Sequence, residues 1–348
     1  MPVFAEARLR EIAQAIVRRM GSAPAEAGIV ADHLVRANLA GHDSHGVGML
    51  PAYVEMLGKG LLVPNQTLQT VLDFGALLVF EAARGFGQRM AAEAVDQAIA
   101  RARQTGACVL ALRNSAHIGR VGTYGEQAAA ANMAFLSFTN VTDHADIAAP
   151  YGSAEARLGT NPVVIAVPGP EGPLLLDMAT TTIAAGKARV AHNKGEPVPP
   201  GSLIDAAGNP TTDPAAFIEA RAGALQTFGL HKGSGIAVMC ELLAGAVAGG
   251  KRAGDPAEGG IVNSMFGVVV DLARLDTEGR VASSVAGALA HLRSARRAPG
   301  FSEILLPGEP ERQAVAARGA AGIPVDDRSW QQIRDAGLAL GLPAEALD

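Results

Sequence analysis

The alternation of short apolar runs with helix-like stretches between residues 70 and 180 most constrains the fold of this chain. ACVLALR (107–113) is a continuous apolar run of the length of a buried strand, and AFLSFTN (134–140) follows after a helix-like stretch. A long amphipathic segment (86–104) ends at Gly106 just before the first of these strands. Other strand-like runs lie at 70–82, 163–168, 174–180 and 266–272. This alternation predicts an α/β protein with an at least partly parallel sheet.

The two ends of the chain have a different character, because their apolar residues recur at helical spacing. Helices are predicted at 4–20 and 24–40, and again at 309–319 and 327–341. The chain has 348 residues, which suggests two domains or one large one, and 49% of them are hydrophobic, which is ample for a core. We therefore predict a mainly helical domain from residues 1–70 with 300–348, and an α/β domain from 71–299. The proline- and glycine-rich segment 192–214 is predicted to be irregular.

Charge and apolar content exclude several classes of protein. The net charge of −5 and the lack of a long basic run argue against a nucleic-acid partner. The longest apolar runs fall short of the ~18 residues of a spanning helix, and the N-terminus has no signal-like apolar region. Cys108 and Cys240 lie in apolar surroundings, as buried free thiols of a reducing compartment do. A cytoplasmic protein without a membrane partner is expected.

Polar, titratable residues are concentrated in GHDSHG (41–46), directly after the second predicted helix. Histidine titrates close to neutrality, so His42 and His45 beside Asp43 and Ser44 suggest proton transfer. The alternative is a polar helix end capped by Asp43 or Ser44. His42, Asp43 and His45 would also suit part of a divalent-metal site. No HExxH or CxxC pattern accompanies them, so we predict no metal.

A second polar segment, NSAHIGRVGTYG (114–125), places His117 directly after a buried strand. Ligands of open α/β sheets bind at the carboxyl ends of strands, and the glycines here allow close approach to the backbone. The segment matches neither GxGxxG nor a P-loop, and a capping loop with a solvated histidine remains an alternative.

Two further residues suit ligand contacts. Asp177 ends the apolar strand LLLD, where it would hold an imidazole tautomer or ribose hydroxyls, or cap the next segment. Lys232 in HKGSG (231–235) would contact a phosphate or carboxylate, or be solvated at a helix start.

Seven segments agree in order and spacing with one known family: DSHGVGMLPAYV, NSAHIGRVGTYGEQAA, LGTNPVVIAVP, LLLDMATTTIAAGK, PVPPGSLIDAAGNPTTDP, HKGSGIAVMCELLAGA and LLPGEPE. The chain resembles the type 2 malate/L-lactate dehydrogenases, which include ureidoglycolate and sulfolactate dehydrogenases. HIGR together with GHDSHGVGM most resembles the hydroxycarboxylate dehydrogenase branch.

The resemblance implies hydride transfer between NAD(P) and a small 2-hydroxy or 2-oxo acid, on a mixed sheet that is not a Rossmann fold. His117 would carry the proton, with Ser44, His45 and Asp177 as further catalytic residues and Arg120 and Tyr53 on the substrate. The 71–299 domain would bind the cofactor, NAD more than NADP, and the protein would be a homodimer. Implied cofactor contacts are His45, Gly119, Arg120, Val121, Leu175, Leu176, Asp177, Met178, Ala179, Lys232, Pro307, Gly308 and Glu309.

One departure from the family pattern affects the mechanism. Many members carry an arginine two residues after Ser-His-Gly-Val, where it holds the substrate carboxylate, but this chain has Met49. Our hypothesis is that Arg120, or an arginine from elsewhere, takes that role. Two alternatives to a dehydrogenase remain: a metal-dependent hydrolase or lyase using His42, Asp43 and His45, and a nucleotide-binding protein without turnover.

Overall fold

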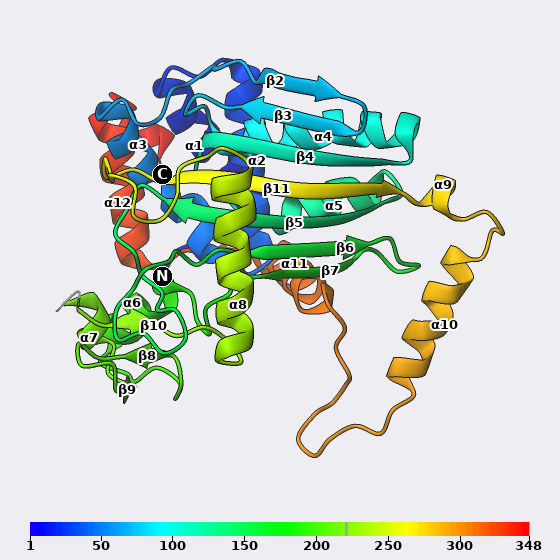
Figure 1. Ribbon diagram of the computed structural model, residues 1–348. Coiled ribbons are helices and arrows are strands. Elements are labelled where there is room, and N and C mark those ends of the chain that lie inside the picture. Colours follow the sequence, from blue (N-terminus) through cyan, green and yellow to red (C-terminus); the bar gives the residue numbers. More distant parts are fainter. Residues whose placement is uncertain (220–221, 348) are drawn as a thin grey trace.

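The computed structural model describes residues 1–219 and 222–347 and shows a mixed α/β protein built on a seven-stranded sheet (Figure 1). The strand order is β2-β3-β4-β11-β5-β6-β7. Among these strands β3 and β4 form the parallel pair, and the other neighbours are antiparallel. The strands are β2 (Gln69–Phe74), β3 (Leu77–Glu81), β4 (Ala107–Ala116), β5 (Met133–Thr142), β6 (Val163–Val167), β7 (Leu174–Met178) and β11 (Val262–Asp271).

The middle of this sheet joins parts of the chain that are far apart in sequence. β4 and β5 are consecutive strands joined by α5 (Gly122–Ala130), yet they are not neighbours. β11 lies between them and pairs with both, Val262 opposite Ala116 on one side and Thr142 on the other. Because β11 is antiparallel to both, β4 and β5 run in the same direction without touching. The predicted alternation is present, but parallel pairing is limited to one pair.

Helices cover both faces of the sheet, as α/β architecture requires. α4 (Gly87–Thr105) and α5 lie on one face, and α8 (His231–Cys240) crosses the other (Figure 1). α4 buries Ala91, Val95, Ala98 and Ala102 at helical spacing, and it ends at Gly106, whose φ is +86°. α8 continues as a π-helical segment (Glu241–Val247).

A second core is formed by helices from the two ends of the chain. α1 (Glu6–Arg19), α2 (Pro24–Leu39), α3 (Leu50–Gly58) and α12 (Asp327–Ala339) pack together around Ile16, Leu34 and Ile333. The two-residue strands β1 (Val3–Phe4) and β12 (Ile323–Pro324) pair antiparallel, so the two ends lie side by side. The four predicted terminal helices are present, counting α11 (Glu309–Ala321), with ends shifted by a few residues.

Two peripheral parts complete the molecule. The segment predicted to be irregular contains the end of α6 (Ala185–Lys194) and strands β8 (Leu203–Ile204) and β9 (Pro210–Thr211), which join β10 (Ala224–Leu225) beside α7 (Ala215–Ile218). α9 (Leu272–Leu275) and α10 (Val281–Arg293) project from one end of the sheet (Figure 1). Across the described residues, no helix is both long and apolar enough to span a membrane.

Candidate active site

A β-bulge at the end of β4 directs the chain into the first predicted site segment. The pairing with β11 runs from Leu112 opposite Met265 to Ser115 opposite Asn263, so β4 has one residue more than its partner. Asn114 takes up this residue with a φ of +53°, a conformation that asparagine tolerates better than most residues. Asn263 Oδ1 then accepts a hydrogen bond of 3.0 Å from the amide of Ile118. The backbone around His117 is thereby fixed.

His117 is hydrogen-bonded through Nδ1 to a tyrosine from the helical core. The Oη of Tyr53, on α3, lies 2.7 Å from His117 Nδ1. The amide of Gln88, in the first turn of α4, contacts the same Oη, with Nε2 placed 2.7 Å away. Tyr53 is 1% exposed and Gln88 0%, so water cannot replace either partner. Because Nδ1 of His117 is occupied by this contact, Nε2 is the ring nitrogen that remains available for a substrate.

The Ser-His-Gly motif lies against the other side of His117. The rings of His45 and His117 stack with centroids 5.5 Å apart and an interplanar angle of 23°. Ser44 Oγ lies 3.0 Å from His45 Nδ1. These residues belong to a 3-10 turn (Asp43–His45), which a second turn (Val47–Met49) joins to α3. Three residues predicted for the site, Tyr53, His45 and His117, therefore meet.

Both histidines are neutral at pH 7, because burial disfavours their charged forms. Burial lowers the pKa of His117 well below its usual value, and the charges of His45, His33 and His144 lower it further. Burial, followed by His42 and Arg120, lowers the pKa of His45 to about 4. A neutral imidazole can accept a proton, which is what a general base requires.

A third histidine, His33 on α2, makes folding sensitive to acid. It is 4% exposed, and burial, followed by the charges of Arg36 and Arg120, lowers its pKa to about 3. In the unfolded chain His33 titrates near 6.5, so the unfolded state binds more protons below that pH. Its contribution to stability is therefore complete above pH 6.5 and is lost as the pH falls toward 3.

We expect His33→Gln to flatten the dependence of stability on pH. Between about pH 6.5 and 5 the wild type should lose on the order of 2 kcal/mol more than the variant, at ~1.4 kcal/mol per pH unit per proton. Urea unfolding at several pH values measures this difference. The slope, and not the absolute stability, is the readout, since the substitution also perturbs a packed site. Parallel slopes in the two proteins would contradict the assignment.

A buried charged cluster adjoins the histidines. Arg120 is 2% exposed, and its Nη1 donates to Glu126 Oε1 at 2.8 Å while its Nε lies 3.3 Å from Asp177 Oδ2. Asp177 also accepts from the amide of Gly122 at 3.0 Å. Burial raises the pKa of Asp177, and Arg120 acts in the opposite direction. Within the described part of the chain, Nη2 of Arg120 is buried without a hydrogen-bond partner.

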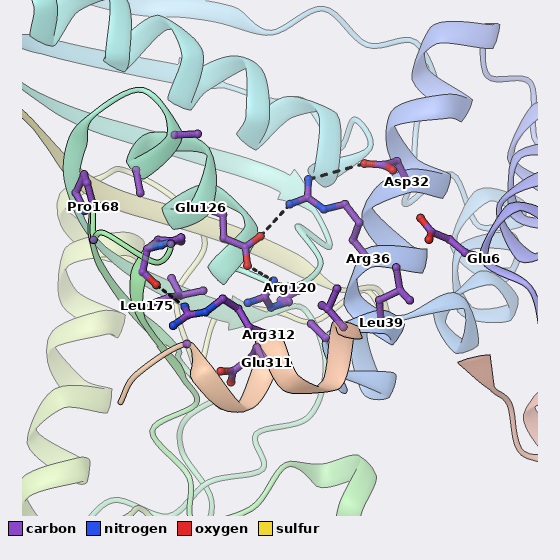
Figure 2. Close-up of a pocket in the computed structure, with 18 of the residues that line it drawn as sticks. Glu6, Asp32, Arg36, Leu39, Arg120, Glu126, Pro168, Leu175, Glu311 and Arg312 are labelled. Atoms are coloured by element: carbon purple, nitrogen blue, oxygen red, sulfur yellow. Dashed lines mark hydrogen bonds and ion pairs between the residues drawn. The ribbon is translucent and has the colours of Figure 1, made fainter. Parts of the chain in front are cut away.

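A cavity of about 840 Å³ opens beside this cluster (Figure 2). Arg120, Leu175 and Gly308, all predicted cofactor contacts, line it. Leu175 N donates to Pro307 O at 3.1 Å, which joins β7 to the Pro-Gly-Glu turn. At Gly308, with φ +89°, a Cβ would lie 3.2 Å from that of Leu175, so the backbones lie close together here. The volume fits a part of a dinucleotide, and Arg120 provides a cation in its lining.

Lys232 and Glu309, which were also predicted to contact the cofactor, do not line this cavity. Lys232 is exposed in the first turn of α8, and none of the described contacts joins its side chain to the other predicted residues. Glu309 accepts from the amide of Leu306 at 2.7 Å and pairs with Arg293. Its carboxylate therefore closes a turn between α10 and α11.

The residues considered for a metal site diverge. Asp43 pairs with Arg318 at 2.6 Å, whereas His42 Nε2 lies 3.5 Å from Glu311 and His45 faces His117. Among the described residues, no three His, Cys, Asp or Glu side chains form a group that could hold a metal ion. The structure thus gives no support to the metal-dependent alternative.

Sequence reasoning missed Gln88, Glu126 and Glu311, which complete the surroundings of His117, Arg120 and His42. A signal existed for Gln88. It lies on the buried face of α4 with Ala91 and Val95, and a polar residue on an apolar helix face needs a partner.

The similarity of this chain to known proteins establishes its family. Its residues 4–334 match the family model of malate/L-lactate dehydrogenase. The chain belongs to the malate/L-lactate dehydrogenase family. This membership confirms the family resemblance and the predicted class, an oxidoreductase of 2-hydroxy acids.

Individual relatives agree with this. The chain is 43% identical to hydroxycarboxylate dehydrogenase B of Escherichia coli (strain K12) over 344 residues, which covers 97% of this chain and 94% of that one. It is 41% identical to an L-lactate dehydrogenase of Cupriavidus necator over 311 residues, or 87% and 88% of the two chains. The solved sulfolactate dehydrogenase of Methanocaldococcus jannaschii superimposes with a TM-score of 0.89 at 31% identity, covering 99% of both chains. The sequence and fold of this dehydrogenase are thus similar to those of these relatives along most of its length.

Proposed function

We propose that this dehydrogenase transfers a hydride between NAD and a small 2-hydroxy or 2-oxo acid, with His117 as the proton carrier. The observation that carries the proposal is the position of His117. It is neutral, it is fixed through Nδ1 by Tyr53, and it stacks on His45 beside the cluster of Arg120 and Asp177. Family membership supplies the reaction class.

The residues of the site have separate roles in the proposed reaction. When bound, the nicotinamide supplies the carbon that accepts or gives the hydride. In oxidation, His117 Nε2 takes the proton of the substrate hydroxyl, and in reduction it returns that proton to the forming hydroxyl. His45, with Ser44 hydrogen-bonded to its Nδ1, stacks on His117 and forms one wall of the site. Asp177 holds Arg120 and the Gly122 amide in place.

Arg120 is the residue that we propose for the substrate carboxylate. Met49, at the position where many family members have an arginine, packs against the helical core. Arg120 is a buried cation whose Nη2 lacks a hydrogen-bond partner in the described residues, and its charge lowers the pKa of His45. An N–H with no partner in such a place is available to a carboxylate.

NAD is favoured over NADP by the ion pairs around the cavity. Arg36 bonds to Glu126 at 2.9 Å and Arg10 to Glu6 at 2.7 Å, and Arg312 lies 3.8 Å from Glu309 (Figure 2 shows the first). The 2′-phosphate of NADP would have to compete with these carboxylates for an arginine. Binding of NADP is therefore weakened relative to binding of NAD.

The larger architecture follows from the same proposal. We propose that residues 1–70 with 300–348 form a helical domain that brings the Ser-His-Gly motif to a cofactor-binding domain (71–299) of non-Rossmann type. A homodimer is supported by exposed apolar side chains along α8 and the π-helical segment: Val238, Met239, Leu242 and Val247. The buried free thiols of Cys108 and Cys240 suit the reducing cytoplasm.

The decisive experiment follows absorbance at the NADH band after addition of a panel of 2-oxo acids to the purified protein. We expect NADH oxidation with at least one acid, faster than with NADPH, and unchanged after dialysis against a chelator. NADH binding without turnover across the panel would favour the nucleotide-binding alternative. NADH oxidation that is lost after chelation would show that the reaction needs a metal, and the absence of both NADH binding and NADH oxidation would favour the metal-dependent hydrolase or lyase.

A further inference from the structure

The amide of Gln88 has a free orientation in an otherwise fixed site. Gln88 is fully buried, and its Nε2 donates to Tyr53 Oη while its Oε1 has no hydrogen-bond partner among the described residues. No described hydrogen bond at its outer end therefore fixes the amide against a rotation of 180°, which exchanges Nε2 and Oε1.

The direction of the hydrogen bonds from Gln88 through Tyr53 to His117 determines which nitrogen of His117 carries the proton. When the Gln88 amide donates to Tyr53 Oη, the tyrosine hydroxyl donates in turn to His117 Nδ1, 2.7 Å away. Neutral His117 then carries its hydrogen on Nε2. In that tautomer Nε2 has no free lone pair, so it cannot take the proton of a substrate hydroxyl.

The opposite orientation gives the useful tautomer. With Oε1 of Gln88 toward Tyr53, the hydroxyl donates to Oε1, and Oη accepts from Nδ1–H of His117. Nε2 then presents a lone pair for oxidation. Protonated His117 makes the same two hydrogen bonds in reduction, so one orientation serves both directions. Burial raises the pKa of Tyr53, so its hydroxyl keeps its proton throughout.

We infer that Gln88 and Tyr53 are positioning residues, which hold His117 in the Nδ1–H tautomer through a chain from Nδ1 to Oη to Gln88 Oε1. This inference rests on the proposed role of His117. Neither residue touches the substrate in this role, because both act through the imidazole. These hydrogen bonds also link the helical core to the sheet core, since Tyr53 comes from α3 and Gln88 from α4.

The tautomer itself can be observed by long-range ¹H–¹⁵N NMR on protein labelled with ¹⁵N-histidine. The chain has eight histidines, and loss of one signal set in His117→Gln assigns His117. We expect the wild type to show Nδ1–H and the Gln88→Met variant, whose side chain cannot accept from Tyr53, to show Nε2–H. Turnover of Gln88→Met should fall about 10- to 100-fold in both directions, whereas Gln88→Glu, which retains an acceptor, should keep the Nδ1–H tautomer.

Tyr124→Phe is the matched control. Tyr124 is also buried, but its hydroxyl donates to the carbonyl of Ile118 and not to the imidazole, so this variant should keep the wild-type tautomer. Nε2–H in the wild type overturns the inference without any variant, as does an unchanged tautomer in a folded Gln88→Met. Full turnover in His117→Gln would instead refute the proposed function, while the tautomer measurement would stand.

Discussion

Replacing His117 by glutamine should lower turnover about 10²- to 10⁴-fold, the usual contribution of a general acid/base, while NADH still binds. Glutamine fills similar space and can still bond to Tyr53, but it cannot carry a proton between substrate and solvent. Steady-state kinetics in both directions measures the loss, and a fluorescence titration with NADH measures cofactor binding. The effect should appear in kcat more than in the Michaelis constant of the substrate.

The matched control for this variant is His291→Gln on the projecting helix α10, where the side chain is exposed. It should leave turnover unchanged. If His117→Gln is near normal while His45→Gln loses activity, the proton carrier is His45, the other member of the stacked pair. If both lose activity equally, the two rings act as a unit.

Replacing Arg120 by methionine should cost about 3–5 kcal/mol of folding stability, because it leaves Asp177 buried without its cation. The double variant Arg120→Met/Asp177→Asn should recover most of this loss, since no unpaired charge remains. Arg120 opposes the burial that raises the pKa of Asp177, so that pKa rises further in the single variant. The penalty should therefore shrink as the pH falls through the raised pKa and Asp177 becomes protonated.

Urea unfolding of the two single variants and the double variant at neutral and mildly acidic pH tests this prediction. The same proteins test the substrate role of Arg120. In the stable double variant the Michaelis constant for the 2-oxo acid should rise well above that of Asp177→Asn alone. Equal constants would remove Arg120 as the carboxylate ligand, and a stability loss unaffected by Asp177→Asn would refute the buried pair.

The sequence predicted local structure well, because local structure depends on neighbouring residues. The apolar runs that became β4 and β5 are visible without any tertiary information, and so is the position of His117 after β4. The place of β11 could not be predicted, since its run FGVVV is apolar throughout and fits any central position of a sheet. The role of Gln88 depends on Tyr53, which is 35 residues away and on another helix.

The family resemblance supplied residues that spacing alone could not. Nothing local marks Leu175 or Gly308 as neighbours, yet they line one cavity because Leu175 N bonds to Pro307 O across more than a hundred residues of sequence. Lys232 remains a predicted cofactor contact without a described link to that cavity, whereas Glu309 follows Gly308 and lies 3.8 Å from Arg312 in the cavity lining. The ion pair of Arg120 with Asp177 likewise required the fold.

The insertion of β11 between β4 and β5 has a consequence for biosynthesis. A ribosome has released residues 107–142 long before it reaches 262–271, so both strands wait with unpaired edges while the rest of the chain is made. Open apolar edges of this kind invite association with other chains, and contacts that span so much sequence form slowly. The nascent chain is therefore most vulnerable to aggregation during this interval, and a transcript cut short before codon 262 yields a product that cannot close its own sheet.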